Sequence, residues 1–410
     1  MRRTLIIIAI VLVLIGIGVV AYFTFGPSAA HLTVTSGNPF GGATSGATTT
    51  IPTTGETETN SGAGTVVAPN LIQITSAAVS GGFIALDIAP ATSTVSLAST
   101  TTRSTPASPG DIEVRYIDRQ SGNTYAFRSM ARSLTRISDK TLPGIQEASW
   151  LPDGSMALAR FLSDSGTSES LDTYALPSDG SDGFFLAQNL TEAKVIGQNS
   201  VFTLSSGVNG SIGAVSQMNG ANSSTIFTSP LSSIIVYPAG GNFIAVSKAA
   251  SELGGYAFSI NPTTGVFTPI LGPLRGLTVL PSPSGKLVLY SYTDGSVFRM
   301  GVFNLSTDAV TSLPLATLAE KCAWSNDSSS LYCGVPTSFA GNIPDDWYQG
   351  VTSFNDRLWR IDLTSRIATL LIDPSQSKKS IDIVNPTIDQ NSRLLVFRNK
   401  KDSSLWAYSL

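Results

Sequence analysis

The chain has 410 residues and a formal net charge of −3, from 25 Lys and Arg residues against 28 Asp and Glu residues. No basic run stands out along it, so nucleic acid is not an expected partner. His31 is the only histidine, which excludes Ser-His-Asp hydrolysis, Cys-His hydrolysis and His-ligated metal sites from the rest of the chain. No calcium-binding or phosphate-binding loop is recognisable, and the sequence predicts neither a cofactor nor a metal site.

Residues 1–26 have the pattern of a membrane anchor. Leu5 to Phe25 are 21 residues without a charge, and a helix of that length covers about 31 Å, enough to cross a bilayer. A cleaved signal peptide is the alternative, since Ser28-Ala29-Ala30 has the small residues of a cleavage site, but its apolar stretch would be shorter. Arg2 and Arg3 precede the span, which predicts a cytoplasmic N-terminus and an extracellular or periplasmic remainder.

Residues 27–64 have the composition of a flexible linker. They are almost wholly Gly, Ser, Thr, Ala, Pro and Asn, and Glu56 and Glu58 are their only charged side chains. Such a segment has too little apolar surface to offset the entropy lost on ordering. We therefore expect a disordered tether between the membrane and a folded domain at residues 65–410.

Residues 65–410 carry a repeat that predicts an all-β fold. Short β-branched and aromatic runs alternate with Gly, Pro, Asn, Asp and Ser every 8 to 12 residues. Equivalent positions of a strand, turn and strand element are held by Trp150, Tyr237, Leu280 and Trp324. Their spacings are 87, 43 and 44 residues, and a degenerate copy near Val195 divides the first. A second hairpin follows each copy, and four strands per repeat is the unit of a propeller blade.

The repeats predict a seven-bladed β-propeller, with six or eight blades as the neighbouring counts. The predicted blades cover residues 71–138, 143–187, 188–228, 229–273, 274–318, 319–377 and 378–410. The last has only three strands, ending at Leu410, so its edge needs a fourth strand from elsewhere. We expect Thr65 to Ala68 to supply it and to close the ring.

Two motifs resemble a known family. Trp150-Leu-Pro-Asp-Gly154 is similar to the core of the WD40-like repeats of TolB-type propellers, and Asp118-Arg-Gln-Ser-Gly122 is similar to their strand-connecting turn. The resemblance implies a propeller with a binding or scaffolding role. TolB-type proteins are soluble periplasmic proteins with an extra N-terminal domain, whereas this chain has a predicted anchor and tether, so their partners are not carried over.

Cys322 and Cys333 are the only two cysteines, and the hairpin register predicts a disulfide between them. In a hairpin around Asn326 to Ser329, residues 322 and 333 fall opposite each other. Opposed side chains in a non-hydrogen-bonded pair approach closely enough for a disulfide, which an oxidising compartment favours. The alternative is a pair of buried free thiols.

Two blades contain long inserts, and the first-blade insert spans Ala91 to Gly110 while the sixth-blade insert spans Thr337 to Asn355. Both are expected between the second and third strands of their blades, which would put them on one face. The sixth-blade insert has the densest polar and aromatic cluster: Asp345, Asp346, Trp347, Tyr348 and Gln349. Such side chains stack sugars, peptides or cations, with the acids fixing orientation. In the alternative, the aromatic residues fold back over the blade and the acids cap a turn.

Three functions fit this organisation. The first is a membrane-tethered extracytoplasmic module that binds a protein or glycan on the insert-bearing face. The second is a glycan hydrolase or lyase using carboxylates such as Asp345, Asp346 and Asp356. The third is a passive subunit of a cell-envelope assembly. The absence of a catalytic motif favours a binding protein over an enzyme.

Overall fold

A computed structural model describes residues 59–60, 65–89, 110–164, 169–295 and 297–410. All of them belong to one compact unit, Glu56–Leu410. The predicted anchor at residues 1–26 lies outside the described residues, as do nearly all of the linker and of the first-blade insert. Within the described ranges, no helix combines the length and apolar character that a bilayer crossing requires.

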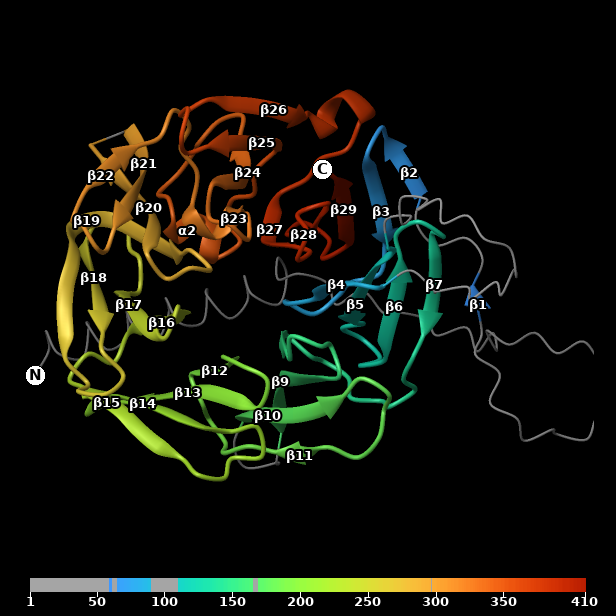
Figure 1. The fold of residues 1–410 in the computed structure, drawn as a ribbon, viewed down its shortest axis with the longest axis horizontal. Helices are drawn as coiled ribbons and strands as arrows, with labels where there is room; N and C mark the ends of the chain where they lie inside the picture. The colour runs from blue at the N-terminus through green and yellow to red at the C-terminus, as the bar shows by residue number, and fades with distance from the viewer. Residues whose placement is uncertain (1–58, 61–64, 90–109, 165–168, 296) are drawn as a thin grey trace, which may run out of the picture. The chain divides into compact units, whose positions relative to one another are not determined.

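The described chain consists of antiparallel sheets arranged around a ring (Figure 1). Counting the seven-stranded sheet as two blades that share β19 gives seven blades of four strands each, with one more strand added outside two of them: β1 (Thr59–Asn60) beside β7, and β2 (Thr65–Ala68) beside β3. The strands of each blade are given from inner to outer. Blade 1 consists of β4 (Ile84–Asp87), β5 (Ile112–Ile117), β6 (Thr124–Arg128) and β7 (Ser133–Arg136), and blade 2 of β8 (Glu147–Trp150), β9 (Met156–Asp164), β10 (Glu169–Pro177) and β11 (Phe184–Phe185). Blade 3 consists of β12 (Glu192–Val195), β13 (Ser200–Gly207), β14 (Gly210–Gln217) and β15 (Ser224–Ser229).

The remaining blades follow the same order. Blade 4 consists of β16 (Ile234–Ala239), β17 (Asn242–Ser247), β18 (Gly254–Ile260) and β19 (Phe267–Pro281). The long strand β19 is also the inner strand of blade 5, which continues with β20 (Leu287–Asp294), β21 (Val297–Asn304) and β22 (Val310–Ser312). Blade 6 is β23 (Cys322–Trp324), β24 (Ser330–Pro336), β25 (Asp356–Asp362) and β26 (Ala368–Ile372), and blade 7 is β27 (Ile383–Ile388), β28 (Leu394–Asn399), β29 (Leu405–Ser409) and β3 (Leu71–Thr75). Short helices are η1 (Ala319–Lys321), α2 (Asp345–Tyr348) and η2 (Pro374–Ser377).

The ring closes where β3, near the start of the described chain, pairs with its last strand. Strand β3 is hydrogen-bonded to β29, and β2 (Thr65–Ala68) pairs on the outer side of β3 (Figure 1). The prediction that Thr65–Ala68 supplies the closing strand is therefore wrong by one strand. Leu71, Ile72 and Ile74 are buried, whereas Val66 is 44% exposed, so the more apolar run takes the position between the blades.

This shift changes which face carries the first-blade insert. Because Leu71–Thr75 belongs to blade 7, the insert joins the first and second strands of blade 1, not the second and third. In agreement, Arg393, in the first turn of blade 7, donates from Nη1 to the carbonyl oxygen of Gly110 at 2.7 Å. The sixth-blade insert does join the second and third strands, β24 and β25. The expectation that both inserts begin on one face is therefore wrong.

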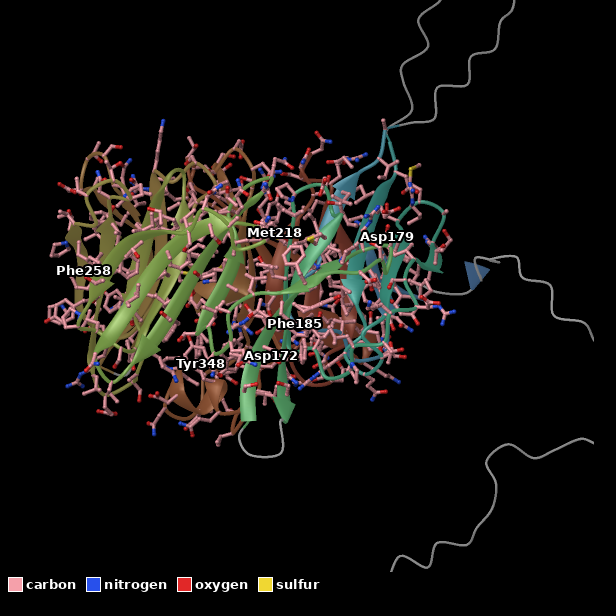
Figure 2. All side chains as sticks on the ribbon, turned by 90° about the horizontal axis from the view of Figure 1, so that it is seen from below. Asp172, Asp179, Phe185, Met218, Phe258 and Tyr348 are labelled. Carbon is pink, nitrogen blue, oxygen red and sulfur yellow. A yellow bond between two sulfur atoms is a disulfide. The ribbon has the colours of Figure 1, made fainter. Side chains whose placement is uncertain are left out.

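We call the side on which the inner strands begin the insert face, because it carries Thr337–Asn355, and the other side the hairpin face. Figure 2 shows Tyr348 near the insert face and Asp179, in a turn between the third and fourth strands of blade 2, near the hairpin face. The apolar core lies between neighbouring blades. The cluster that joins blades 7 and 1, for example, contains Ile74, Val114 and Val396.

Turn chemistry fixes the hairpins at the predicted positions. Asp118 accepts hydrogen bonds on Oδ1 from the backbone nitrogen and hydroxyl of Ser121, at 2.8 and 2.7 Å, and Gly122 has a φ of 76°. A carboxylate that caps such a turn and a glycine at positive φ are the features that the sequence pattern predicts. The same arrangement of strand and turn recurs around the ring.

Candidate functional site

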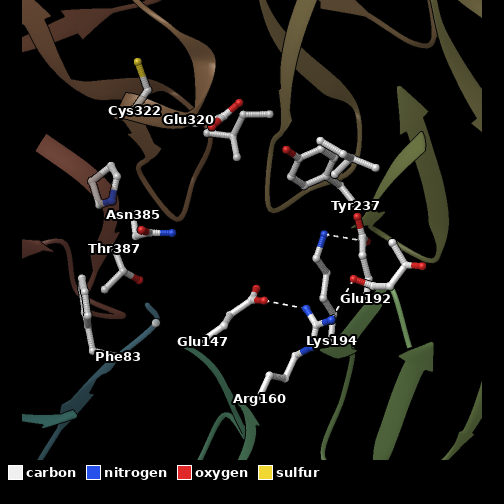
Figure 3. A pocket seen from close by; sticks show the side chains of 15 residues that line it. Phe83, Glu147, Arg160, Glu192, Lys194, Tyr237, Glu320, Cys322, Asn385 and Thr387 are labelled. Carbon is white, nitrogen blue, oxygen red and sulfur yellow. Dashed lines mark hydrogen bonds and ion pairs between the residues drawn. The ribbon is translucent and has the colours of Figure 1, made fainter. Parts of the chain in front are cut away.

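The inner strands surround a central cavity of about 540 Å³. All seven blades contribute side chains to its wall (Figure 3). The lining includes Gly82, Phe83, Glu147, Arg160, Glu192, Lys194, Tyr237, Leu280, Glu320, Cys322, Asn385 and Thr387. A concave site with several convergent polar groups is the usual place for ligand binding in such a protein.

Two cations in the wall are held by groups of the protein itself. Arg160 pairs with Glu147 at 2.7 Å and donates from Nη2 to the carbonyl oxygens of Leu190 and Thr191 at 2.7 and 2.8 Å. Lys194 pairs with Glu192 at 3.0 Å and donates to the carbonyl oxygen of Val236 at 2.7 Å. These cations fix the positions of blades 2, 3 and 4 relative to one another.

The carboxylates of Glu147 and Glu320 face the cavity from different sides (Figure 3). The side chain of Glu147 is 48% exposed, so it keeps hydrogen-bonding capacity toward the cavity. Burial raises the pKa of Glu320, which accepts a hydrogen bond from the Tyr348 hydroxyl. Burial also raises the pKa of Tyr237 well above its usual range, and the charges of Glu320 and Glu192 add to this effect. The cavity thus favours uncharged forms of Glu320 and Tyr237.

A buried ion-pair cluster lies behind Glu320. Lys321 Nζ contacts Asp356 Oδ2 at 2.7 Å and Asp382 Oδ1, and donates to the carbonyl oxygen of Ile383 at 3.0 Å. The three charged side chains are fully shielded from solvent. Burial, with the charge of Asp382 as a lesser cause, raises the pKa of Asp356 to about 6 against the opposing effect of Lys321.

The sixth-blade insert covers this cluster. The indole nitrogen of Trp347 donates to both Asp382 oxygens, at 3.2 and 3.0 Å, and only 4% of Trp347 is exposed. Its ring is stacked with Phe354, with 6.4 Å between the centroids. The Tyr348 hydroxyl reaches Glu320 at the cavity wall. The interpretation in which these aromatic residues fold back over the blade describes their placement, and Trp347 offers no free ring face to a ligand.

The other residues of the predicted binding loop are also placed. Asp345 accepts a hydrogen bond from the backbone nitrogen of Ser251 in blade 4 at 2.6 Å. Asp346 accepts one from the backbone nitrogen of Asn342 at 2.8 Å. Gln349 is exposed. Each of the two acids thus uses one carboxylate oxygen to hold the insert. Asp356 is enclosed in the ion-pair cluster and is not accessible to a glycan.

The predicted disulfide is confirmed. Cys322 and Cys333 are paired residues of β23 and β24, with 4.1 Å between their Cα atoms and a bond between their sulfur atoms. The bond connects the two strands next to Glu320 and Lys321. No cluster of three or more His, Cys, Asp or Glu side chains suited to a metal ion is found among the described residues.

Sequence reasoning missed the cavity residues because they are distributed over all seven repeats. A pattern is visible in retrospect, since Glu147 and Glu192 each stand three positions before the marker residue of their repeat, Trp150 or Val195. These positions begin the inner strands or adjoin them, and they therefore face the centre of the ring. Aligning charged residues by repeat phase would have identified this part of the wall.

Comparison with known proteins supports the fold and no more. No protein-family model and no curated protein matches the chain. Oligogalacturonate lyase from Vibrio parahaemolyticus is similar in structure, with a TM-score of 0.50 and 10% identity over 73% of this chain and 86% of that one. Puromycin hydrolase has a TM-score of 0.47 and 14% identity, over 72% of this chain and 49% of that one.

A third similar structure is the β-propeller domain of Cps50 (Swd1) from Myceliophteria thermophila, with a TM-score of 0.44 and 10% identity over 73% of this chain and 93% of that one. The lyase is an enzyme, so a fold of this kind does not exclude enzymatic activity. Together with the strand order, the similarity to the lyase shows that this chain has a β-propeller fold.

Proposed function

We propose that this protein is a binding module that takes a polar group of a glycan or protein partner into the central cavity from the insert face. The cavity carries this proposal, because all seven blades line it and Glu147 and Asn385 keep exposed polar atoms there. The cations Arg160 and Lys194 are already bound by backbone carbonyl groups. The wall is therefore preorganised, which lowers the entropy lost on binding.

We further propose that the propeller is held outside the cytoplasm by the apolar helix expected at Leu5 to Phe25. Two observations support this location. The 21 uncharged residues are long enough to span a bilayer. The disulfide between Cys322 and Cys333 is of the kind that persists in oxidising compartments.

Binding of the full chain to glycan and peptide arrays tests the proposed function. Replacing the whole insert is unsuitable, because Trp347 covers a buried ion pair and its loss would destabilise the fold. The double variant Glu147→Gln/Asn385→Ala changes exposed groups of the cavity instead, and it should lose at least tenfold in affinity for any partner found. Val208→Ser, in a fully exposed turn of blade 3, is the control. Equal binding by the cavity variant and the wild type would contradict the proposal.

A glycan hydrolase or lyase is the second candidate, and one observation favours it. Glu320, whose pKa burial raises, and the more exposed Glu147 face the same cavity. Two carboxyl groups in unlike environments can act as acid and base. If this candidate holds, the wild type degrades a polysaccharide and Glu320→Gln abolishes the turnover. Absence of turnover by the wild type across acidic and neutral polysaccharides would remove this candidate.

A further inference from the structure

Arg398 is a charged side chain that its surroundings do not neutralise. It belongs to β28, and its side chain is partly buried between blades 7 and 1. A guanidinium has five N–H donors, yet Nη1 makes a hydrogen bond of 3.4 Å to the carbonyl oxygen of Val79, and the buried Nε has no partner among the described residues. Buried charges are normally paired, so this exception calls for an explanation.

The charged neighbours of Arg398 increase the imbalance. Burial lowers the pKa of Arg398, and the positive charge of Arg119 lowers it further, while Glu147 opposes both. Arg119 itself donates to the neutral side chain of Gln146. Lys400, two residues along, donates to the carbonyl oxygen of Trp347, and Arg398 contributes to lowering its pKa. Glu147 is already paired with Arg160.

Arg398 also lies close to residues that line the central cavity, although it is not itself part of the lining. It pairs across β27 with Val384, and the next residue, Asn385, lines the cavity. On the other side, Nη2 lies 3.9 Å from the position that a Cβ atom would take at Gly81, whose neighbour Gly82 also lines the cavity. The absence of a side chain at Gly81 leaves this approach open.

We infer that Arg398, supported by Arg119, binds a carboxylate of the ligand that occupies the central cavity. The forked N–H groups of arginine match the two oxygens of a carboxylate. A singly charged group fits better than a doubly charged phosphate, because Glu147 and Glu192 add negative charge to the cavity wall. The inference rests on the proposed binding function and adds the chemical class of the ligand, which an acidic sugar or a peptide C-terminus would both provide.

Calorimetric titration of the full chain tests this assignment. The ligands are glucuronate and acetyl-triglycine, with glucose and acetyl-triglycine amide as their neutral counterparts. The wild type should bind at least one carboxylate and discriminate against its neutral counterpart. Arg398→Gln should weaken that binding at least tenfold, a loss typical of a charged hydrogen bond. Arg299→Gln removes the same charge from a side chain that is 55% exposed in blade 5 and should bind as the wild type does.

The outcomes distinguish an acidic glycan from a peptide C-terminus as the source of the carboxylate. They also distinguish failure of the carboxylate site from failure of the proposed binding function. Binding of glucuronate alone assigns an acidic glycan, and binding of the peptide alone assigns a C-terminus. If neither carboxylate binds, or if Arg398→Gln binds as well as the wild type, the assignment is overturned. The proposed binding function would then survive only if the Glu147→Gln/Asn385→Ala variant still loses a partner on the arrays.

Folding of the variant provides an independent readout. Because Arg398 makes little compensating contact, Arg398→Gln should melt no lower than the wild type, whereas a structural arginine would lower the melting temperature. If Arg398→Gln fails to fold, the melting result contradicts the assignment, because it shows that Arg398 stabilises the fold. Arg398→Lys, which keeps the charge and lacks the fork, then tests binding alone, and unchanged affinity in it counts against the assignment.

Discussion

Lys321 is a fully buried cation placed between two carboxylates, Asp356 and Asp382. The three side chains carry one net negative charge in their ionised forms, and removal of this charge from water is costly. Trp347 and the backbone nitrogen of Phe354 direct N–H groups at Asp382, which compensates that carboxylate. Asp356 receives less compensation, since its Oδ1 has no hydrogen-bond partner among the described residues.

The stability of the propeller should therefore fall as Asp356 ionises. Its pKa is about 6 in the folded protein against an ordinary value of 3.8, so the folded state holds the proton more tightly. The favourable contribution is fully present below pH 3.8 and is lost as the pH rises through 6. At about 1.4 kcal/mol per pKa unit, we expect Asp356 to remove roughly 2 kcal/mol of stability between pH 4 and pH 7.

Urea denaturation of the wild type and Asp356→Asn across this pH range measures the effect as a difference in slope. Asp327→Asn is the matched control. Hydrogen bonds from Ser325 and Ser329 lower the pKa of the exposed Asp327 to about 2, so its own contribution changes only below pH 4. Parallel pH profiles for the wild type and Asp356→Asn would show that the Asp356 carboxyl does not titrate in this window.

At the scale of the element, the insert Thr337–Asn355 is a clamp across several blades. Asp345 binds the backbone of blade 4, Tyr348 binds Glu320 in blade 6, and Trp347 binds Asp382 in blade 7. The sequence shows the cluster of acids and aromatic residues but not their partners. Those partners lie 28 to 94 residues away in the sequence and come together only in the folded propeller. A local pattern therefore could not separate a ligand-binding loop from a clamp.

Truncation of the clamp at its centre should destabilise the fold. Trp347→Ala removes a buried ring and the donor to Asp382, and we expect a loss of about 3 to 5 kcal/mol in the free energy of unfolding. Gln349→Ala, two residues along on the exposed side of the same insert, should change it by less than about 0.5 kcal/mol. Chemical denaturation measures both. Equal stability of the two variants would show that the insert does not hold the blades.

At the scale of the whole molecule, the sequence shows the repeat but not the point at which the ring closes. The markers Trp150, Tyr237, Leu280 and Trp324 all fall in or beside inner strands, as the spacing of 43 residues predicts. The repeat does not mark where the ring closes, because Leu71–Thr75 resembles any other apolar strand. When Leu71–Thr75 is assigned to blade 1, the first insert is predicted between the second and third strands of that blade, whereas it joins the first and second strands. The cavity wall was also hidden, since it unites residues from seven repeats.

Closure of the ring gives the last prediction. Ile74 is 2% exposed in β3, between blades 7 and 1, and Ile74→Asp would bury an unpaired charge and loosen the closing strand. We expect a loss of more than about 4 kcal/mol and association through the freed edge of β29. Val66→Asp, in the neighbouring outer strand β2, changes a side chain that is 44% exposed and should cost less than about 1 kcal/mol. Denaturation and size-exclusion chromatography of the two variants make the comparison. If Ile74→Asp elutes as the wild type does and is as stable as Val66→Asp, β3 does not close the ring.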